Sequence, residues 1–594
     1  MPEAEHDEIL GSAFDRRLVA RLVGVARPHQ FLILITTLLF PLIAVVELAQ
    51  PFLMKVAIDE HILRADWRGL TGVAGLFLAA LLLLSALRGA ESYLMHLTGQ
   101  RVMHDLRGAL FRHLLRMDAA FFDRNPVGRL MTRVLHDVEA VSEAFTSGLF
   151  AVVGDVITLA GVVAVMLWLD WRLALVTFSL VPVLGAVAGY FRVRARDAYR
   201  EVRRRLARLN AFLQESLQGM TVIQLFARER PEAEAFRRFN TEYRRAMFGS
   251  TIWEASLYAG VEALGSAALA LLLWYGAGRI GAAALTFGTL VAFIQYTNRF
   301  FLPIRDLGAK YTVMQAAMAS SERIFGLLDL ESGVVSPPAA RPRPAQGGPS
   351  PVAFRSVWFA YEGEAWVLED CSFTVAPGER VALVGATGEG KSTCARLLNR
   401  SYDVTRGQVL VDGVDAREWD LASLRRHVGI IFQDTVLFTG TVEANLQLGR
   451  DGQVSREELE RAIEAANCRR VIEGLPRGLA TPLTERGSNL SHGERQLLAI
   501  ARALVYNPAI LVLDEATSSV DPESEALIRR ALARLVEGRT TITIAHRLST
   551  VQDADRILVL HRGRMHEEGN HADLLRRGGL YARLWELSVR TRAT

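Results

Sequence analysis

A single lysine in the second half of the chain stands in a pattern of residues that suits phosphate binding. Lys391 is one of only three lysines among 68 basic residues, and it lies in the segment Gly385-Ala-Thr-Gly-Glu-Gly-Lys-Ser-Thr393. The spacing G-x-x-x-x-G-K-S/T is that of a phosphate-binding loop, in which backbone N–H groups surround phosphate oxygens and the lysine reaches the β- and γ-phosphates. A compact ammonium fits such a loop better than the wider guanidinium of arginine. The segment therefore predicts a site for a nucleoside triphosphate.

The residues on either side of this loop are those that a nucleotide-binding fold requires. A short apolar run precedes the loop at residues 380 to 384, and a helix-forming run follows at residues 394 to 398. A strand, a glycine-rich loop and a helix in this order bring the helix N-terminus against the phosphates. We therefore expect the nucleotide to be bound by the glycines, the hydroxyl groups and the lysine of the loop: Gly385, Thr387, Gly388, Gly390, Lys391, Ser392 and Thr393.

Two consecutive acidic residues follow a second apolar run. Asp514 ends the run that begins at Ile510, and Glu515 comes directly after it. A carboxylate at a strand end is where a phosphate-loop fold holds Mg²⁺, with the hydroxyl of Ser392 as a further ligand. Glu515 is expected to act as the general base on the attacking water. An Asp-Glu pair on its own is more often a surface feature, so this interpretation depends on the motifs around it.

Long apolar runs fill the first 330 residues, whereas residues 350 to 594 mix charged and apolar positions as soluble domains do. A helix needs about 20 apolar residues to cross a bilayer. We predict six spans, near residues 31 to 54, 71 to 96, 147 to 169, 172 to 191, 255 to 277 and 284 to 304.

Arginines concentrate in two of the connecting segments, which places these segments and both termini in the cytoplasm. Nucleic-acid binding is the alternative for these arginines, and their position beside the spans disfavours it.

These features predict an all-α six-helix transmembrane domain followed by an α/β P-loop ATPase domain. The polar segments between spans keep helical periodicity, so the helices are expected to continue beyond the bilayer and to turn near residues 121 to 128 and 215 to 223. The first 27 residues are largely polar, so we expect no cleavable signal peptide. The predicted parts are a cytoplasmic segment (1 to 27), a transmembrane domain (28 to 325), a proline-rich linker (326 to 351) and a nucleotide-binding domain (352 to 588).

Three cysteines, Cys371, Cys394 and Cys468, all fall in the predicted nucleotide-binding domain. They form no CxxC pair and lack the spacing of zinc ligands. We expect three free thiols in the cytosol.

Further motifs surround the acidic pair, and with them the sequence resembles the nucleotide-binding domain of ABC transporters. Leu490-Ser-His-Gly-Glu-Arg-Gln496 opens a helix upstream, and Ser518-Ser-Val-Asp521 and Thr543-Ile-Ala-His-Arg547 follow downstream. The resemblance implies ATP as the nucleotide, with Tyr361 stacking on adenine and Gln433 as the Q-loop residue near Mg²⁺, beside Ser392 and Asp514. It implies that Asp521 is the D-loop aspartate and that His546 contacts the γ-phosphate. Taken alone, Tyr361 would more often be a core residue and His546 a surface histidine.

The resemblance extends over nearly the whole chain, because six spans followed by one nucleotide-binding domain is the layout of half-transporter exporters of type IV, or subfamily B. Bacterial members of this type export drugs or lipids, so the resemblance implies a multi-pass protein of the bacterial cytoplasmic (inner) membrane. In that family Ser491 and Gly493 complete the ATP site of the opposite subunit. The resemblance therefore implies that this chain is one half of a dimer.

The signature sequence departs from the family pattern at two positions. It has Leu-Ser-His-Gly-Glu where the family has Leu-Ser-Gly-Gly-Gln. Glu494 is a mild change, whereas His492 brings an imidazole close to the expected position of the partner's γ-phosphate. Because Lys391, Asp514 and Glu515 are intact, this combination resembles one subunit of a heterodimeric exporter. A homodimer that tolerates His492 is the alternative.

The expected function is ATP-driven export of amphipathic drugs, lipids or peptides by alternating access. Glu47, Asp155 and Glu262 lie in or near the spans and would suit cationic substrates, but pairing with neighbouring arginines or a place at the membrane interface is the favoured explanation. The alternative function is a non-transporting membrane ATPase that senses or regulates through a partner. A soluble phosphate-loop kinase is excluded, since it would contain neither spans nor signature.

Overall fold

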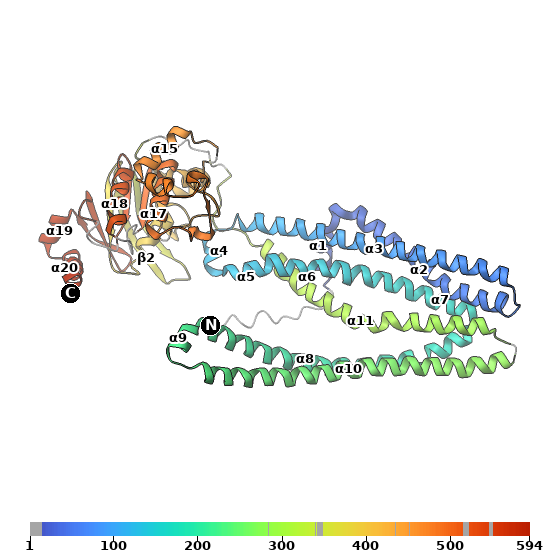
Figure 1. Ribbon diagram of the computed structural model, residues 1–594. Helices are drawn as coiled ribbons and strands as arrows, with labels where there is room; N and C mark the ends of the chain where they lie inside the picture. Colours follow the sequence, from blue (N-terminus) through green and yellow to red (C-terminus); the bar gives the residue numbers. More distant parts are fainter. Residues whose placement is uncertain are drawn as a thin grey trace. The chain divides into compact units, whose positions relative to one another are not determined.

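The computed structural model describes residues 15–282, 284–338, 340, 348–433, 435–450, 452–514, 522–545 and 551–593. The chain forms two compact units (Figure 1). One unit combines Met1–His113 with Gly128–Asp329, and the other combines Leu114–Val127 with Leu330–Thr594. The short segment 114–127 therefore belongs to the unit that carries the nucleotide motifs, although predicted membrane helices lie on both sides of it in the sequence.

The first unit is helical throughout its regular structure. Its α-helices are α1 (Arg16–Ala26), α2 (Gln30–Val56), α3 (Trp67–Leu114), α5 (Val127–Thr132), α6 (Val138–Glu143), α7 (Ala151–Phe178), α8 (Val181–Gln218), α9 (Met220–Leu225), α10 (Glu229–Gly281) and α11 (Phe287–Leu328). A 3₁₀ turn, η2 (Arg27–His29), and three π-helical segments, η3 (Ala57–Ile62), η4 (Arg133–Asp137) and η5 (Ala144–Phe150), connect some of them.

Four continuous helical stretches within the described residues are long and apolar enough to cross a membrane: Arg16–Ile62, Trp67–Leu114, Val127–Gln218 and Glu229–Gly281. The six predicted spans coincide with α2, α3, α7, α8, α10 and α11, while the number that crosses the bilayer stays a prediction. The fourth predicted span, residues 172 to 191, is interrupted by a turn at Ser179 and Leu180. Pro182 lies in the first turn of α8, where its missing N–H costs no helical hydrogen bond, so a new helix begins there.

Asp170 separates the two spans within α7. Its backbone leaves the helical region at φ −160° and ψ 105°, and its carboxylate accepts the N–H groups of Arg172 at 2.9 Å and Leu173 at 3.0 Å. The guanidinium of Arg279 from α10 contacts both carboxylate oxygens of Asp170, at 2.9 and 2.7 Å. The aspartate therefore caps the second part of α7 and joins it to α10.

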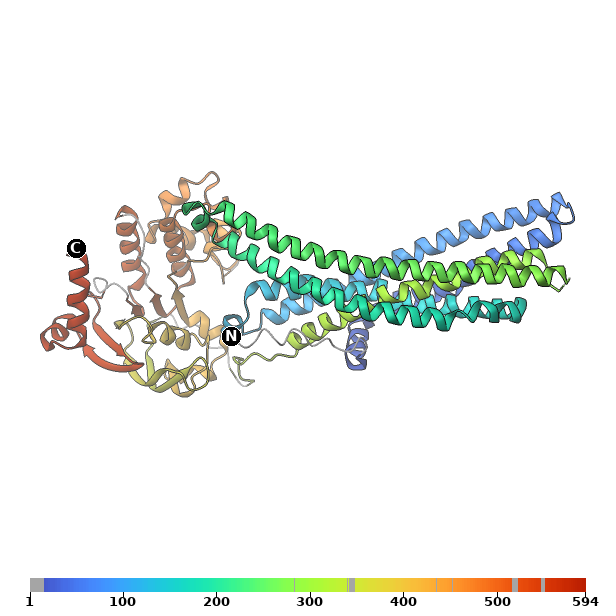
Figure 2. The ribbon, with the colours of Figure 1, turned by 90° about the horizontal axis from the view of Figure 1, so that it is seen from below.

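The expected helical extensions beyond the predicted spans are confirmed. The helix α3 continues to Leu114, and α8 continues to Gln218 before α9 turns the chain into α10. Helices α8 and α10 run side by side over most of their length, and α11 lies beside α7 (Figures 1 and 2). Aromatic residues join α8 to α10, as where the Phe212 and Phe239 rings lie 5.2 Å apart.

The second unit is built around a six-stranded sheet in the order β12-β11-β3-β10-β9-β6 and a four-stranded sheet in the order β2-β1-β4-β5. The strands are β1 (Val352–Ala360), β2 (Trp366–Val375), β3 (Arg380–Val384), β4 (Arg406–Val411), β5 (Val414–Asp415), β6 (Val428–Ile431), β7 (Gly440–Thr441), β8 (Pro482–Leu483), β9 (Ile510–Asp514), β10 (Thr540–Ile544), β11 (Arg556–His561) and β12 (Arg564–Gly569). The helices are α4 (Ala119–Arg124), α12 (Lys391–Leu398), α13 (Leu421–His427), α14 (Val442–Leu446), α15 (Arg456–Ala465), α16 (Arg469–Glu473), α17 (His492–Tyr506), α18 (Pro522–Val536), α19 (His571–Arg577) and α20 (Leu580–Ala593).

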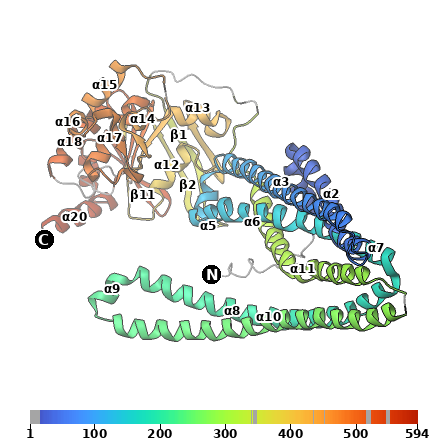
Figure 3. The same cartoon turned by 45° about the vertical axis from the view of Figure 1, so that its right-hand side comes forward.

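Side chains that alternate along the central strands are buried on both faces of the larger sheet. In β9, Ile510 and Val512 pack in the core that includes α12 and the smaller sheet, whereas Leu511 and Leu513 pack in the core that includes α14, α15, α17 and α18. Figure 3 shows the helices of this unit around its strands. Burial on two faces explains the nearly continuous apolar sequence of these strands. The predicted fold class, a helical membrane domain followed by an α/β domain, is confirmed.

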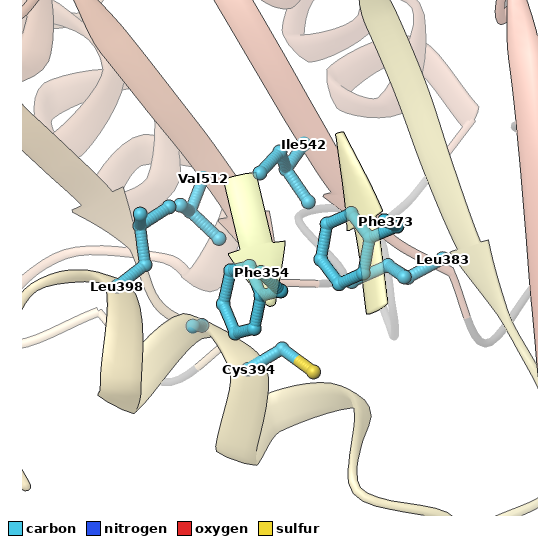
Figure 4. Close-up of a pocket in the computed structure, with 8 residues that line it drawn as sticks. Phe354, Phe373, Leu383, Cys394, Leu398, Val512 and Ile542 are labelled. Atoms are coloured by element: carbon cyan, nitrogen blue, oxygen red, sulfur yellow. The ribbon is translucent and has the colours of Figure 1, made fainter. Parts of the chain in front are cut away.

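The core behind the phosphate loop is closed and apolar (Figure 4). The rings of Phe354 and Phe373 stack 4.5 Å apart between the two sheets, and Cys394 of α12 faces them. All three cysteines are free thiols, as expected, and the structure buries them. A hydrogen bond with Cys371 and burial raise the pKa of the Cys394 thiol. These thiols pack as small apolar residues.

Candidate nucleotide-binding site

The predicted phosphate loop leaves β3 at Val384 and enters α12 at Lys391. Gly388 and Gly390 have φ values of +90° and +96°, which only glycine adopts without strain. A Cβ atom on Gly390 would lie 2.7 Å from Leu368 Cδ2, and one on Gly385 would lie 2.4 Å from the carbonyl oxygen of Leu560. The glycine spacing of the motif therefore reflects both backbone conformation and close packing.

Lys391 is buried, with 3% of its surface exposed. Its ammonium donates to the carbonyl oxygens of Gly385 at 2.8 Å and Ala386 at 2.7 Å. These contacts hold a positive charge inside the curve of the loop, at the N-terminus of α12. Thr387, Gly388 and Ser392 are exposed around it. A cation, a helix N-terminus and exposed hydroxyl groups together suit a triphosphate, so the residues fit ATP.

Tyr361 follows β1 and lies beside the loop. Its hydroxyl group and the hydroxyl of Thr393 are 3.1 Å apart, within hydrogen-bond distance. The rings of Phe359 and Tyr402 meet the Tyr361 ring edge-on, at centroid distances of 4.8 and 5.1 Å. The structure thus brings the predicted adenine-stacking residue to the phosphate loop.

The predicted metal ligands lie at one edge of the larger sheet. Asp514 is the last residue of β9 and pairs with Ile544 of β10, and β10 in turn pairs with β3. Ile431 of β6 pairs with Leu513, and Gln433 follows two residues later, exposed. Because the carboxyl ends of parallel strands share an edge, Asp514 and Gln433 emerge on the side where β3 enters the phosphate loop.

Three predicted site residues lie outside the described residues: Glu515, Asp521 and His546. Their roles stay predictions. The described strands end close to two of them in sequence, β9 at Asp514 and β10 at Ile544.

The predicted signature segment opens α17. Ser491 is the N-cap residue, Gly493 is buried in the first turn, and His492 is partly exposed between them. The Ser491 hydroxyl accepts the N–H of Glu494, and the Glu494 carboxylate accepts the N–H of Ser491. This reciprocal arrangement is a capping box, whose S-x-x-E pattern is visible in the sequence.

Two further contacts near the site carry no local sequence signal. Glu389 of the phosphate loop accepts the backbone N–H of Arg562, and its carboxylate lies 3.3 Å from the His561 ring. The helix α4 reaches the other side of the site through Asp123 and Arg124.

Two of the three acidic residues in or near the spans are paired in the structure, Glu47 with an arginine, as the favoured explanation requires, and Asp155 with a lysine. Glu47 contacts Arg88 at 3.0 Å, and Asp155 contacts Lys310. Glu262 is exposed on α10.

Comparison with known proteins agrees with this arrangement. The family model described as the ABC transporter transmembrane region matches residues 33–304, and the ABC transporter model matches residues 368–518. An uncharacterized ABC transporter ATP-binding protein of Bacillus subtilis is 37% identical over 580 residues, covering 97% of this chain and 96% of its own length. An ATP-dependent lipid A-core flippase of Thiobacillus denitrificans is 36% identical, with coverages of 96% and 98%.

The chain is also similar to a putative multidrug exporter and to a solved exporter structure. A putative multidrug export ATP-binding/permease protein of Bacillus subtilis is 34% identical over 96% of this chain and 99% of its own. The structure of a bacterial Atm1-family ABC exporter with ATP bound superimposes with a TM-score of 0.76 at 31% identity, covering 96% of this chain and 99% of that one.

A membrane helix bundle and an α/β ATPase domain on one chain define an ATP-driven membrane transporter. This chain belongs to the ABC transporter family, and it is a multi-pass inner-membrane exporter that hydrolyses ATP.

Proposed function

We propose that this chain is one half of a dimeric exporter that moves an amphipathic drug, lipid or peptide across the bacterial inner membrane. The observation that supports it most is the placement of Lys391, Tyr361 and Thr393 around one loop at the carboxyl edge of the sheet. The relatives include both a lipid A-core flippase and a putative multidrug exporter, which favours amphipathic substrates as a class.

The proposed roles in hydrolysis follow from residue chemistry. Lys391 holds a positive charge against the β- and γ-phosphates, and backbone N–H groups from Gly385 to Thr393 donate to phosphate oxygens. Ser392, Asp514 and Gln433 offer oxygen ligands to Mg²⁺, which neutralises charge on the phosphate oxygens when bound. Glu515 orients water and accepts its proton, and His546 contacts the γ-phosphate.

A second subunit is part of this proposal. ABC exporters act as dimers, and Ser491 and Gly493 of this chain are proposed to close over the partner's ATP, with Asp521 near the same boundary. His492 makes the signature of this chain unusual while its own loop is intact. We therefore favour a heterodimer in which the more active ATP site combines Lys391 and Glu515 of this chain with the partner's signature.

The oligomeric state is tested with the purified chain, alone and after coexpression with candidate partners. A mass of one copy plus a different half-transporter, with ATPase activity far above that of the chain alone, is the expected result. A fully active homodimer would remove the heterodimer from the proposal.

The transport function is tested in reconstituted vesicles with fluorescent lipids, cationic dyes and labelled peptides. We expect ATP-dependent movement of at least one probe, abolished by Lys391→Ala. ATP hydrolysis that moves no probe, yet changes when a partner protein is added, would favour the non-transporting sensor instead.

A further inference from the structure

The helix α4 packs against the nucleotide-binding fold through both of its ends. Asp118 caps its first turn by accepting the N–H of Phe121 at 2.9 Å, and it also accepts the N–H of Gly333 at 2.7 Å. Ala119 and Ala120 pack on the core that contains β1, β2 and α12. The segment is therefore fixed to this unit by backbone contacts as well as by apolar packing.

The last turn of α4 carries the polar contacts. The hydroxyl of Tyr402 donates to Asp123 Oδ2, and the guanidinium of Arg396, from α12, lies 3.2 Å from the same oxygen. Burial raises the pKa of the Tyr402 phenol, and the hydrogen bond to Asp123 raises it further. Tyr402 is 9% exposed, so its hydroxyl has few alternative partners in solvent. Asp123 thereby fixes the orientation of the Tyr402 ring.

Tyr361 is contacted by the ring of Tyr402 and by a side chain of α4. The two tyrosine rings meet at 88°, with their centroids 5.1 Å apart. Arg124, next to Asp123 in the sequence, donates to the carbonyl oxygen of Tyr361 at 3.2 Å. One neighbour thus limits the tilt of the Tyr361 ring and the other holds its backbone.

We propose that Asp123 and Arg124 are positioning residues that set the affinity of the site for the adenine base, by holding Tyr361 in its stacking orientation. The inference rests on the proposed role of Tyr361 as the adenine-stacking residue. Preorganisation of this kind lowers the entropy lost when the base binds, so it affects affinity more than the chemical step. A segment between two membrane helices then contributes to nucleotide recognition in the same chain.

The test compares ATP with inorganic tripolyphosphate, which has phosphates but no base. The full-length exporter is assayed for ATPase activity after Asp123→Asn, Arg124→Ala and Tyr402→Phe, with tripolyphosphate as a competitive inhibitor. Tyr361→Ala is the benchmark. Glu139→Gln is the matched control, because this acid lies in the same connection, is 71% exposed, and has the exposed His136 as its ion-pair partner at 4.0 Å.

We expect KM for ATP to rise about three- to tenfold in each positioning variant, the effect of losing one hydrogen bond that orders the site. The inhibition constant of tripolyphosphate and kcat should stay within about twofold of the parent, as should all constants of Glu139→Gln. Tyr402→Phe keeps the ring and removes only the hydroxyl, so it gives the result even if Asp123→Asn fails to fold.

Three contrary outcomes distinguish failure of the positioning role of Asp123 and Arg124 from failure of the adenine-stacking role of Tyr361. If Tyr361→Ala raises KM for ATP selectively and the α4 variants do not, the positioning role is refuted while the adenine assignment stands. Equal weakening of ATP and tripolyphosphate also refutes it, since that indicates a general disturbance of the phosphate loop. If Tyr361→Ala itself leaves KM for ATP unchanged, both the adenine assignment and the positioning role are refuted.

Discussion

Ser491 and Glu494 bond to each other's backbone at the start of α17. The hydroxyl of Ser491 accepts the Glu494 N–H at 3.2 Å, and the Glu494 carboxylate accepts the Ser491 N–H at 2.7 Å. Two backbone donors that the helix itself cannot satisfy are thereby paired. The glutamate that departs from the ABC signature pattern thus has a local structural role.

Replacing Glu494 with alanine should therefore lower the free energy of unfolding by about 1 kcal/mol, the value of a lost cap. Glu494→Gln should lose much less, because its amide oxygen still accepts the Ser491 N–H. Thermal unfolding of the full-length protein in detergent measures both variants. If both lower the melting temperature equally, the capping box is not what stabilises this turn.

The break at Asp170 gives a second prediction. Asp170→Ala removes a helix cap and leaves Arg279, which is only 19% exposed, without its carboxylate. We expect a loss of about 2 kcal/mol or more, since uncompensated partly buried charge is costly. The control is Asp197→Ala, whose pairing with Arg200 at 3.7 Å is exposed and should contribute less than about 0.5 kcal/mol. Similar melting temperatures for the two variants would contradict the interpretation.

Sequence patterns predicted the elements of the site wherever the signal is local. The turn between β3 and α12 could be predicted because Gly385, Gly390 and Lys391 all lie in one turn of backbone, so their spacing is fixed. The position of Asp514 at a strand end could be predicted because the apolar pattern of that strand is continuous. These predictions need no knowledge of how distant parts of the chain meet.

Contacts across long sequence separations could not be predicted in this way. Asp123 and Tyr402 are 279 residues apart, and neither belongs to a motif that implies the other. The turn inside the fourth predicted span was not predictable for a different reason. Hydropathy averages over about 20 residues and does not register a two-residue turn at Ser179 and Leu180, which Pro182 makes favourable.

Glu515 is the residue on which the proposed hydrolysis mechanism depends. Glu515→Gln keeps the size of the side chain but cannot accept a proton, so we expect kcat to fall by about 100-fold or more. ATP binding should persist, because the phosphate loop is unchanged. Steady-state hydrolysis and fluorescent ATP-analogue binding test the two parts, and undiminished turnover would remove Glu515 from the role of base.

Gly390→Ala probes the geometry of the phosphate loop. The added methyl group would face Leu368 Cδ2 at 2.7 Å and a backbone φ of +96°, so strain and overlap act together. We expect a loss of about 2 kcal/mol or more in stability and loss of ATP binding. Gly363→Ala is the control, since its φ is also positive, at +53°, but its Cβ would meet nothing within 4 Å. Equal effects would mean that backbone strain alone, without overlap, explains the loss.

His427 at the end of α13 gives a prediction about pH. It is 3% exposed, its Nε2 lies 2.9 Å from the Ser350 hydroxyl, and its ring packs on Trp419. Burial lowers the pKa of this imidazole, while the charge of Asp412 opposes the shift. The folded state therefore binds fewer protons than the unfolded state once pH falls below the ordinary histidine value of about 6.5, and stability decreases from there downward.

Replacing His427 with glutamine should remove this part of the acid sensitivity. We expect the melting temperature of the parent to fall between pH 7.5 and pH 5.5 by more than that of His427→Gln, even if the variant is less stable at both values. His136→Gln is the control, because it makes the same replacement at a side chain that is 75% exposed. Equal decreases in the parent and His427→Gln would show that the buried imidazole does not govern the response, and other groups with shifted pKa values would then account for it.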